Sequence, residues 1–131
     1  MAESKFTLDT LNGLLFEWFP MLGTPEYLKL IGDLGGLGPF VVLGIIFSRY
    51  VEGMVISGTP EDRASIAGFL EHMAKTEDRG VVELLRIEIL PTLWKTQRSI
   101  DSYWEYFGVE TRRVLIWLAP KHAPQITLPS D

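Results

Sequence analysis

Two histidines, His72 and His122, are the side chains of this sequence best suited to chemistry. A zinc hydrolase places two histidines on one helix face and adds a third ligand. Here no second histidine follows Glu71-His72 at that offset, and His122 lies far away near the C-terminal end. The 131 residues include no cysteine, which excludes disulfides and cysteine-based metal sites. We therefore expect no metal site and no cofactor, and we interpret both histidines as exposed or partly buried side chains.

Serine-based catalysis needs a hydroxyl group next to a base. Ser48, Ser99 and Ser102 are present, but no local signature joins any of them to a histidine. A catalytic triad is defined by its geometry in space, so the sequence alone leaves it open. We expect no catalytic residue and predict that the chain is not an enzyme, with a hydrolase as the minor alternative.

Acidic pairs and a glycine-rich segment also have structural explanations. Glu61-Asp62 and Glu77-Asp78 lie where helices are expected to begin, and carboxylates there cap backbone amides and favour the helix dipole. The segment "GDLGGLGP" at residues 32–39 lacks the preceding strand and the closing lysine or serine of a phosphate-binding loop. We interpret it as the end of one helix followed by a tight turn.

Helix starts are marked by a four-residue sequence, Gly-Thr-Pro-Glu, which occurs at residues 23–26 and again at residues 58–61. In each copy the threonine is suited to cap a helix, the proline to take its first position, and the glutamate to lie beside its positive end. The residues that follow the two copies differ. We therefore interpret them as two helix starts with the same capping chemistry, not as an internal repeat.

Apolar residues recur at helical spacing along most of the chain. Leu8, Leu11, Leu14, Leu15 and Trp18 form one such series, with Thr7 or Asp9 as its cap, and Asp78 is expected to cap a later helix. The helix at 99–107 is expected to carry Ile100, Tyr103, Trp104 and Phe107 on one face, and the last helix carries Val114, Leu115 and Trp117. Together with the Gly and Pro breaks, the spacing predicts helices at about 8–18, 25–34, 39–57, 60–76, 80–94 with a kink or break at Pro91, 99–107 and 110–118.

The predicted fold class is all-α, a single compact domain of six to eight short helices in a helical array or bundle. The domain is expected to span residues 1–119, and residues 120–131, which contain three prolines, are predicted to be a flexible, disordered or extended tail. The segment "PQITLPS" is the only short strand candidate. The most apolar segment, residues 39–57, contains Arg49 and Glu52, whereas a membrane span needs ~20 predominantly apolar residues. We interpret it as a central helix buried on most sides.

The net charge is −5 and arises in the first part of the chain. Residues 1–80 contain 6 bases and 11 acids (6 − 11 = −5), and residues 81–131 contain 6 of each (6 − 6 = 0). An acidic chain repels phosphate backbones, so we expect no nucleic-acid partner, and a basic protein partner is favoured. The N-terminal "MAESKFTLDT" lacks the pattern of a secretory signal. We therefore predict a cytoplasmic location and no membrane association.

Residues 39–118 carry a series of cues that resembles a known group of proteins. The cues are Gly38-Pro39 before an apolar helix, Phe69-Leu70-Glu71-His72-Met73, Val82-Glu83-Leu84-Leu85, and the segment from Gly108 through Arg112. They are similar to those of a family of small, all-helical bacterial domains that resemble immunity proteins of polymorphic toxin systems. The resemblance supplies no catalytic residues. It implies a protein that binds and neutralises a cognate toxin in the cytoplasm.

On this hypothesis the chain is a protein-binding domain that acts by occlusion: rigid helices would cover a toxin's site with acidic and aromatic side chains. The alternative is a structural or adaptor module, including a homodimer that buries the aromatic stretch "SYWEYF" at residues 102–107. The candidate partner-binding residues lie on the expected helices at 60–76 and 99–107. They are Glu61, Asp62, Glu71, Asp101, Glu105 and Tyr106.

Overall fold

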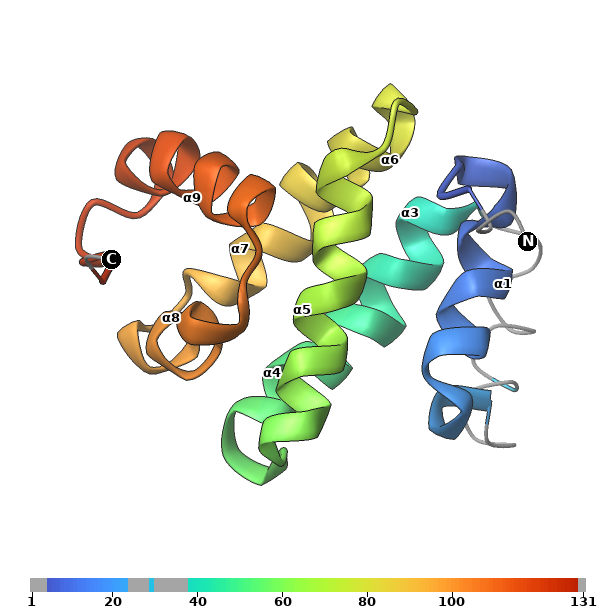
Figure 1. Ribbon diagram of the computed structural model, residues 1–131, viewed down its shortest axis with the longest axis horizontal. Helices are drawn as coiled ribbons and strands as arrows, with labels where there is room; N and C mark the ends of the chain where they lie inside the picture. The colour runs from blue at the N-terminus through green and yellow to red at the C-terminus, as the bar shows by residue number, and fades with distance from the viewer. Residues whose placement is uncertain (1–4, 24–28, 30–37, 130–131) are drawn as a thin grey trace.

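The computed structural model describes residues 5–23, 29 and 38–129, and all regular structure in this part of the chain is helical. The described residues form a compact single domain of six helices, if α3–η2–α4 and α6–η3–α7 are each counted as one continuous helix, and no strand occurs among them, so the all-α prediction is confirmed. The long helix α5 lies at the centre, with α1 on one side and α8 and α9 on the other (Figure 1). The elements are α1 (Leu8–Trp18), η1 (Pro20–Gly23), α3 (Pro39–Val42), η2 (Leu43–Phe47), α4 (Ser48–Ser57), α5 (Pro60–Lys75), α6 (Arg79–Leu84), η3 (Leu85–Ile89), α7 (Leu90–Leu93), α8 (Gln97–Tyr103), η4 (Trp104–Tyr106) and α9 (Val109–His122).

Helix starts follow the predicted capping chemistry. Thr7 caps α1, and Thr59 caps α5 through a capping box in which its hydroxyl accepts from the Asp62 amide while the Asp62 carboxylate accepts from the Thr59 amide. In the first Gly-Thr-Pro-Glu copy, residues 24–26 lie outside the described residues, and so does all of the helix expected at 25–34 except residue 29. Asp78 caps α6 and also accepts a hydrogen bond from the Leu8 amide, so one carboxylate joins the starts of α1 and α6. That bond from Leu8 holds the pKa of Asp78 below its ordinary value.

Two π-helical turns, η2 and η3, pack against each other in the middle of the two longest apolar segments. A Cβ added to Gly44 of η2 would lie 2.5 Å from a carboxylate oxygen of Glu88 in η3, so the missing side chain allows this close approach. The Ser48 hydroxyl donates to the Glu88 carbonyl at 2.9 Å. Pro91 follows η3, and instead of breaking there the helix continues through the π-helical turn to Leu93.

The core contains a cluster of aromatic rings between α1, η2 and α5. The rings of Phe6, Phe19, Phe47 and Phe69 are buried and lie 5.0 to 5.5 Å from their neighbours in the cluster. His72 stacks on Phe6 at 5.0 Å, so its ring extends this aromatic cluster. The contacts of Phe6 with Phe69 and with His72 hold α5 against the start of the N-terminal helix.

The stretch at 102–107 contributes to a second part of the core. Tyr103, Trp104 and Phe107 are buried within the chain, as the predicted apolar face required. The Tyr103 hydroxyl donates to the Val51 carbonyl at 2.5 Å, and burial raises the pKa of this phenol far above its ordinary value. Three aromatic rings of the stretch proposed for a homodimer are therefore already packed inside one chain.

The central apolar helix is less enclosed than predicted. Phe40–Ser57 is long and apolar enough, by length and composition, to cross a membrane, with mean hydropathy 1.7, and 39% of it is buried. A core helix passes the same test. Its buried side chains are spaced at helical intervals, whereas Ile56 near its end is 74% exposed. One face of the helix packs on the core, and the side chains of the other face are partly exposed among the described residues.

The C-terminal helix is longer than predicted. α9 runs to His122 rather than ending near Leu118, and it includes the exposed Pro120 in its last turn. Beyond it, Ala123 is buried, and Gln97 holds the chain at Thr127 by two hydrogen bonds, to the amide at 2.8 Å and to the carbonyl at 2.6 Å. Residues 123–129 therefore lie against the domain in a non-helical conformation.

Candidate protein-binding surface

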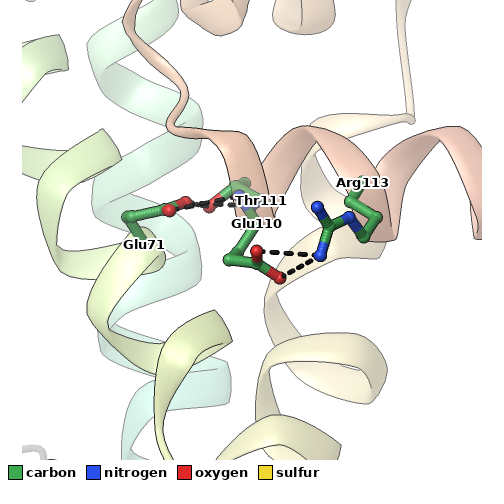
Figure 2. Close-up of polar contacts among 4 residues, drawn as sticks. All are labelled: Glu71, Glu110, Thr111 and Arg113. Carbon is green, nitrogen blue, oxygen red and sulfur yellow. Dashed lines mark hydrogen bonds and ion pairs between the residues drawn. The ribbon is translucent and has the colours of Figure 1, made fainter.

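The position of α9 is set by a carboxylate from another helix. Its N-cap is Gly108, which has no side chain to cap the first amides. Glu71 of α5 takes this role: one carboxylate oxygen accepts from the Thr111 amide at 2.9 Å and hydroxyl at 2.8 Å, and the other accepts from the Glu110 amide at 3.1 Å (Figure 2). We call this set of bonds the Glu71 cap. It fastens the start of α9 to α5.

The Glu71 cap explains two further features. Burial opposes the charged form of Glu71, but the hydrogen bonds from Thr111 and Glu110 outweigh it, so the pKa of the carboxyl lies below its ordinary value. A Cβ added to Gly108 would lie 2.4 Å from the Glu71 carboxyl carbon. Gly108 is therefore needed where the backbone approaches Glu71, and two of the sequence cues that carry the family resemblance meet at this contact.

The sequence-predicted binding residues lie on α5, α8 and η4, and several of them bond within the chain. Asp62 belongs to the α5 capping box, Glu71 forms the Glu71 cap, and Asp101 accepts a hydrogen bond from Gln97 at 2.9 Å. Asp62 and Glu71 are nine residues apart on one helix, which is roughly 14 Å. Glu61 and Glu105 are exposed, and Tyr106 is half-buried against the core. The six residues therefore have different local environments.

The exposed apolar residues of α9 form a surface that the sequence interpretation missed. Val109, Ile116 and Trp117 are 69%, 53% and 56% exposed, and Pro120 is also exposed. At 3.6 residues per turn these four positions fall on one side of the helix together with the exposed Arg113, opposite the buried residues Thr111, Leu115, Leu118 and Ala119. We call the side formed by Val109, Ile116, Trp117 and Pro120 the α9 outer face.

Trp117 lies on the exposed side of α9. Leu115 is buried and Val114 is partly buried, but Trp117 is exposed and two cations lie near its ring. The Lys121 ammonium is 3.8 Å from the centre of the Trp117 ring, and the Arg86 guanidinium carbon is 5.3 Å from it. The reason is the helical offset: Trp117 and Leu115 point in directions about 160° apart. The signal in the sequence was an apolar run, "VLIWLA", long enough to surround a helix.

A pocket of about 260 Å³ lies between α9 and the segment η3–α7, and Glu83 and Arg86 are among the residues that line it. Its apolar wall contains Pro91, Trp94 and Leu118, together with Ile87, which is 56% exposed. The His122 ring stacks on Trp94 at 5.6 Å and lines the pocket. His72 and His122 thus each stack on an aromatic ring, and no group of three or more metal-binding side chains occurs among the described residues.

Comparison with known proteins adds no relative: no protein-family model, no curated protein and no solved structure matches this chain. The resemblance to immunity proteins therefore stays a prediction based on the sequence cues.

Proposed function

We propose that this chain is a protein-binding domain that docks a partner on the α9 outer face. We further propose that it acts as an immunity-type protein, which neutralises a cognate bacterial toxin in the cytoplasm by occlusion. The observation that carries the proposal is the α9 outer face itself. The core side of α9 is buried, and on its other side Val109, Ile116 and Trp117 are exposed to solvent. Exposed apolar clusters of this kind are typical of sites where another molecule binds.

Trp117 is the anchor expected to contribute most to binding. Tryptophan is enriched among residues that dominate interface energies, because it buries a large apolar area with few rotatable bonds. With 56% of the residue exposed, covering Trp117 would remove on the order of 100 Å² from water, worth about 2–3 kcal/mol.

The support beneath the α9 outer face is rigid. Leu115 and Leu118 are buried below it, and the Glu71 cap fixes its first turn on α5. A surface that is already ordered loses little conformational entropy when it binds, so more of the contact energy appears as affinity. The acidic net charge of the whole chain would still speed the approach of a basic toxin. In this mechanism the helix face covers the toxin's site and does not change it chemically.

The experiment is co-expression of this chain with the product of the neighbouring gene, followed by a measurement of growth and of affinity between the two purified proteins. Wild-type protein is expected to restore growth and bind the partner. Trp117→Ala is expected to weaken binding by at least about tenfold. The matched control is Ile56→Ala, which removes an exposed apolar side chain from α4, and it should bind like wild type.

Equal affinity of the Trp117→Ala and Ile56→Ala proteins would show that the α9 outer face is not the binding surface. A neighbouring product that neither inhibits growth nor binds the chain would remove the immunity role. Circular dichroism of both variants should match that of the wild type, so that a change in affinity reports on the surface alone.

A further inference from the structure

We infer that Gln97 and Asp101 form a docking site for an extended peptide segment of a partner protein, and that the chain's own residues 123–129 occupy this site as a displaceable strap. We call residues 123–129 the strap and the two α8 residues the Gln97 site. The strap turns back from the end of α9 to reach α8 (Figure 1). The inference adds a second binding site and does not depend on the α9 outer face.

The Gln97 side-chain amide binds the main chain of the strap. Its Nε2 donates to the Thr127 carbonyl at 2.6 Å, and its Oε1 accepts from the Thr127 amide at 2.8 Å. The amide and carbonyl of one residue point to the same side in an extended backbone, which is how strands exchange paired bonds. The two bonds therefore recognise an extended main chain, whatever side chain the central residue carries.

Asp101 fixes the orientation of the Gln97 amide. It lies about one helical turn after Gln97 and accepts from the same Nε2 at 2.9 Å. A carboxylate only accepts hydrogen bonds, so the nitrogen of the amide faces Asp101 and the oxygen is left to accept from the main chain of the strap. A partner segment would meet an amide that its own helix already orients, which lowers the entropy cost of binding.

Apolar side chains on both sides of Thr127 add a second element of recognition. Ile126 and Leu128 are half-buried and pack against the core, whereas Thr127 is exposed. Residues two positions apart in an extended segment point to the same face. The strap itself therefore shows which chemistry the Gln97 site accepts, an extended segment with apolar residues on either side of a central residue of any type. The strand candidate "PQITLPS" contains this pattern.

The strap is lightly held, which makes it displaceable. Among residues 124–129 none is fully buried, and Pro124, Gln125 and Thr127 are exposed. Chain ends with few buried contacts open at a low cost in free energy. While the strap is bound, its tether gives it an effective concentration on the order of millimolar, so it excludes a competing segment. A partner would therefore bind the Gln97 site after the strap is released.

The test uses the full chain and a synthetic peptide, Ala-Pro-Gln-Ile-Thr-Leu-Pro, which copies the strap. Thr127→Pro removes the amide hydrogen that bonds to Gln97, whereas the matched control Thr127→Ala keeps it. The NMR resonances of the Gln97 side-chain amide should shift in Thr127→Pro but not in Thr127→Ala. Added peptide should reverse this shift, and it should bind Thr127→Pro at least about tenfold more tightly than Thr127→Ala.

Two further changes locate the bound peptide. Gln97→Glu, combined with Thr127→Pro, removes the donor to the peptide carbonyl, so binding should fall at least about tenfold. The new carboxylate lies in the first turn of α8, where it favours the helix dipole, so circular dichroism should stay unchanged. A peptide with serine in place of isoleucine and leucine should bind at least about tenfold more weakly, and one with alanine in place of threonine should bind like the original.

The inference would be overturned by unshifted Gln97 resonances in Thr127→Pro, by no peptide binding to that variant, or by equal binding after Gln97→Glu. A wild-type dimer in sedimentation experiments that Gln97→Glu abolishes would also overturn it, because the strap of a second copy would then occupy the site. Trp117→Ala should leave peptide binding unchanged. The outcome is therefore separate from that of the co-expression test.

Discussion

Replacement of Glu71 is the sharpest test of how this fold holds its last helix. In Glu71→Ala the amides of Glu110 and Thr111 lose their acceptor, and so does the Thr111 hydroxyl. Loss of a helix cap costs about 0.5–2 kcal/mol, and hydrogen bonds to a charged group contribute about 1.5–3 kcal/mol each before solvent replaces them. Because Glu71 is only partly buried whereas Thr111 is fully buried, we expect a loss of about 2 kcal/mol in the free energy of unfolding, at the upper end of the range for a cap.

Glu71→Gln separates the charge from the shape. The glutamine oxygen still accepts from Thr111, but its amide group faces the Glu110 amide donor, so about half of the loss is expected to remain. The assay is urea denaturation followed by circular dichroism, with hydrogen exchange of the Thr111 amide as a local probe. The control is Glu105→Ala, an exposed carboxylate for which we expect a change within about 0.5 kcal/mol. If Glu71→Ala were no more destabilising than Glu105→Ala, the Glu71 cap would not support α9.

Two further predictions concern the same region. Gly108→Ala should destabilise the protein by about 1–3 kcal/mol, because its Cβ would lie 2.4 Å from the Glu71 carboxyl carbon. The loss in the free energy of unfolding should be smaller when Glu71 is also replaced by alanine. Urea denaturation of the single and double variants measures this difference. The lowered pKa values of Glu71 and Asp78 predict that stability is fully present at pH 7. It should begin to fall as the pH drops through the ordinary values of 4.5 and 3.8, and the loss should be complete once the pH passes below the lower folded-state values. Urea midpoints measured from pH 7 to pH 3 should decline less in Glu71→Ala than in wild type, and parallel curves for the two proteins would contradict the assignment.

Much of the fold was predictable because helix formation depends on neighbours within a few residues. Thr7, Thr59 and Asp78 were named as caps from their position before apolar periodic segments, and each accepts a hydrogen bond from an amide two or three residues on. The buried face of α8 and η4 followed from the spacing of Ile100, Tyr103 and later aromatic residues. The π-helical turn before Pro91 could not be predicted from neighbouring residues, because it is packed against a second such turn, η2, from another helix.

The candidate binding surface was harder to predict than the fold. Glu71 looked like a free acid in the sequence, and only the structure shows that its carboxylate bonds to residues 39 and 40 positions later. The exposure of Trp117 was not predictable, because an apolar side chain in an apolar run gives no indication of which side of the helix will be covered. The pocket lined by Leu118 and His122 is formed by residues of α6, η3, α7 and α9 together.

The amino-acid sequence by itself determined that this chain is helical, where most of its helices begin, and which residue types were available for chemistry. Capping and periodicity act over one or two turns, so their effects can be read from adjacent residues. The tertiary structure alone decided that Glu71 caps α9, that the described residues leave one side of α9 exposed, and that two cations lie near the Trp117 ring. Those features depend on how whole helices pack against each other, and that packing is set by the sum of contacts between distant segments.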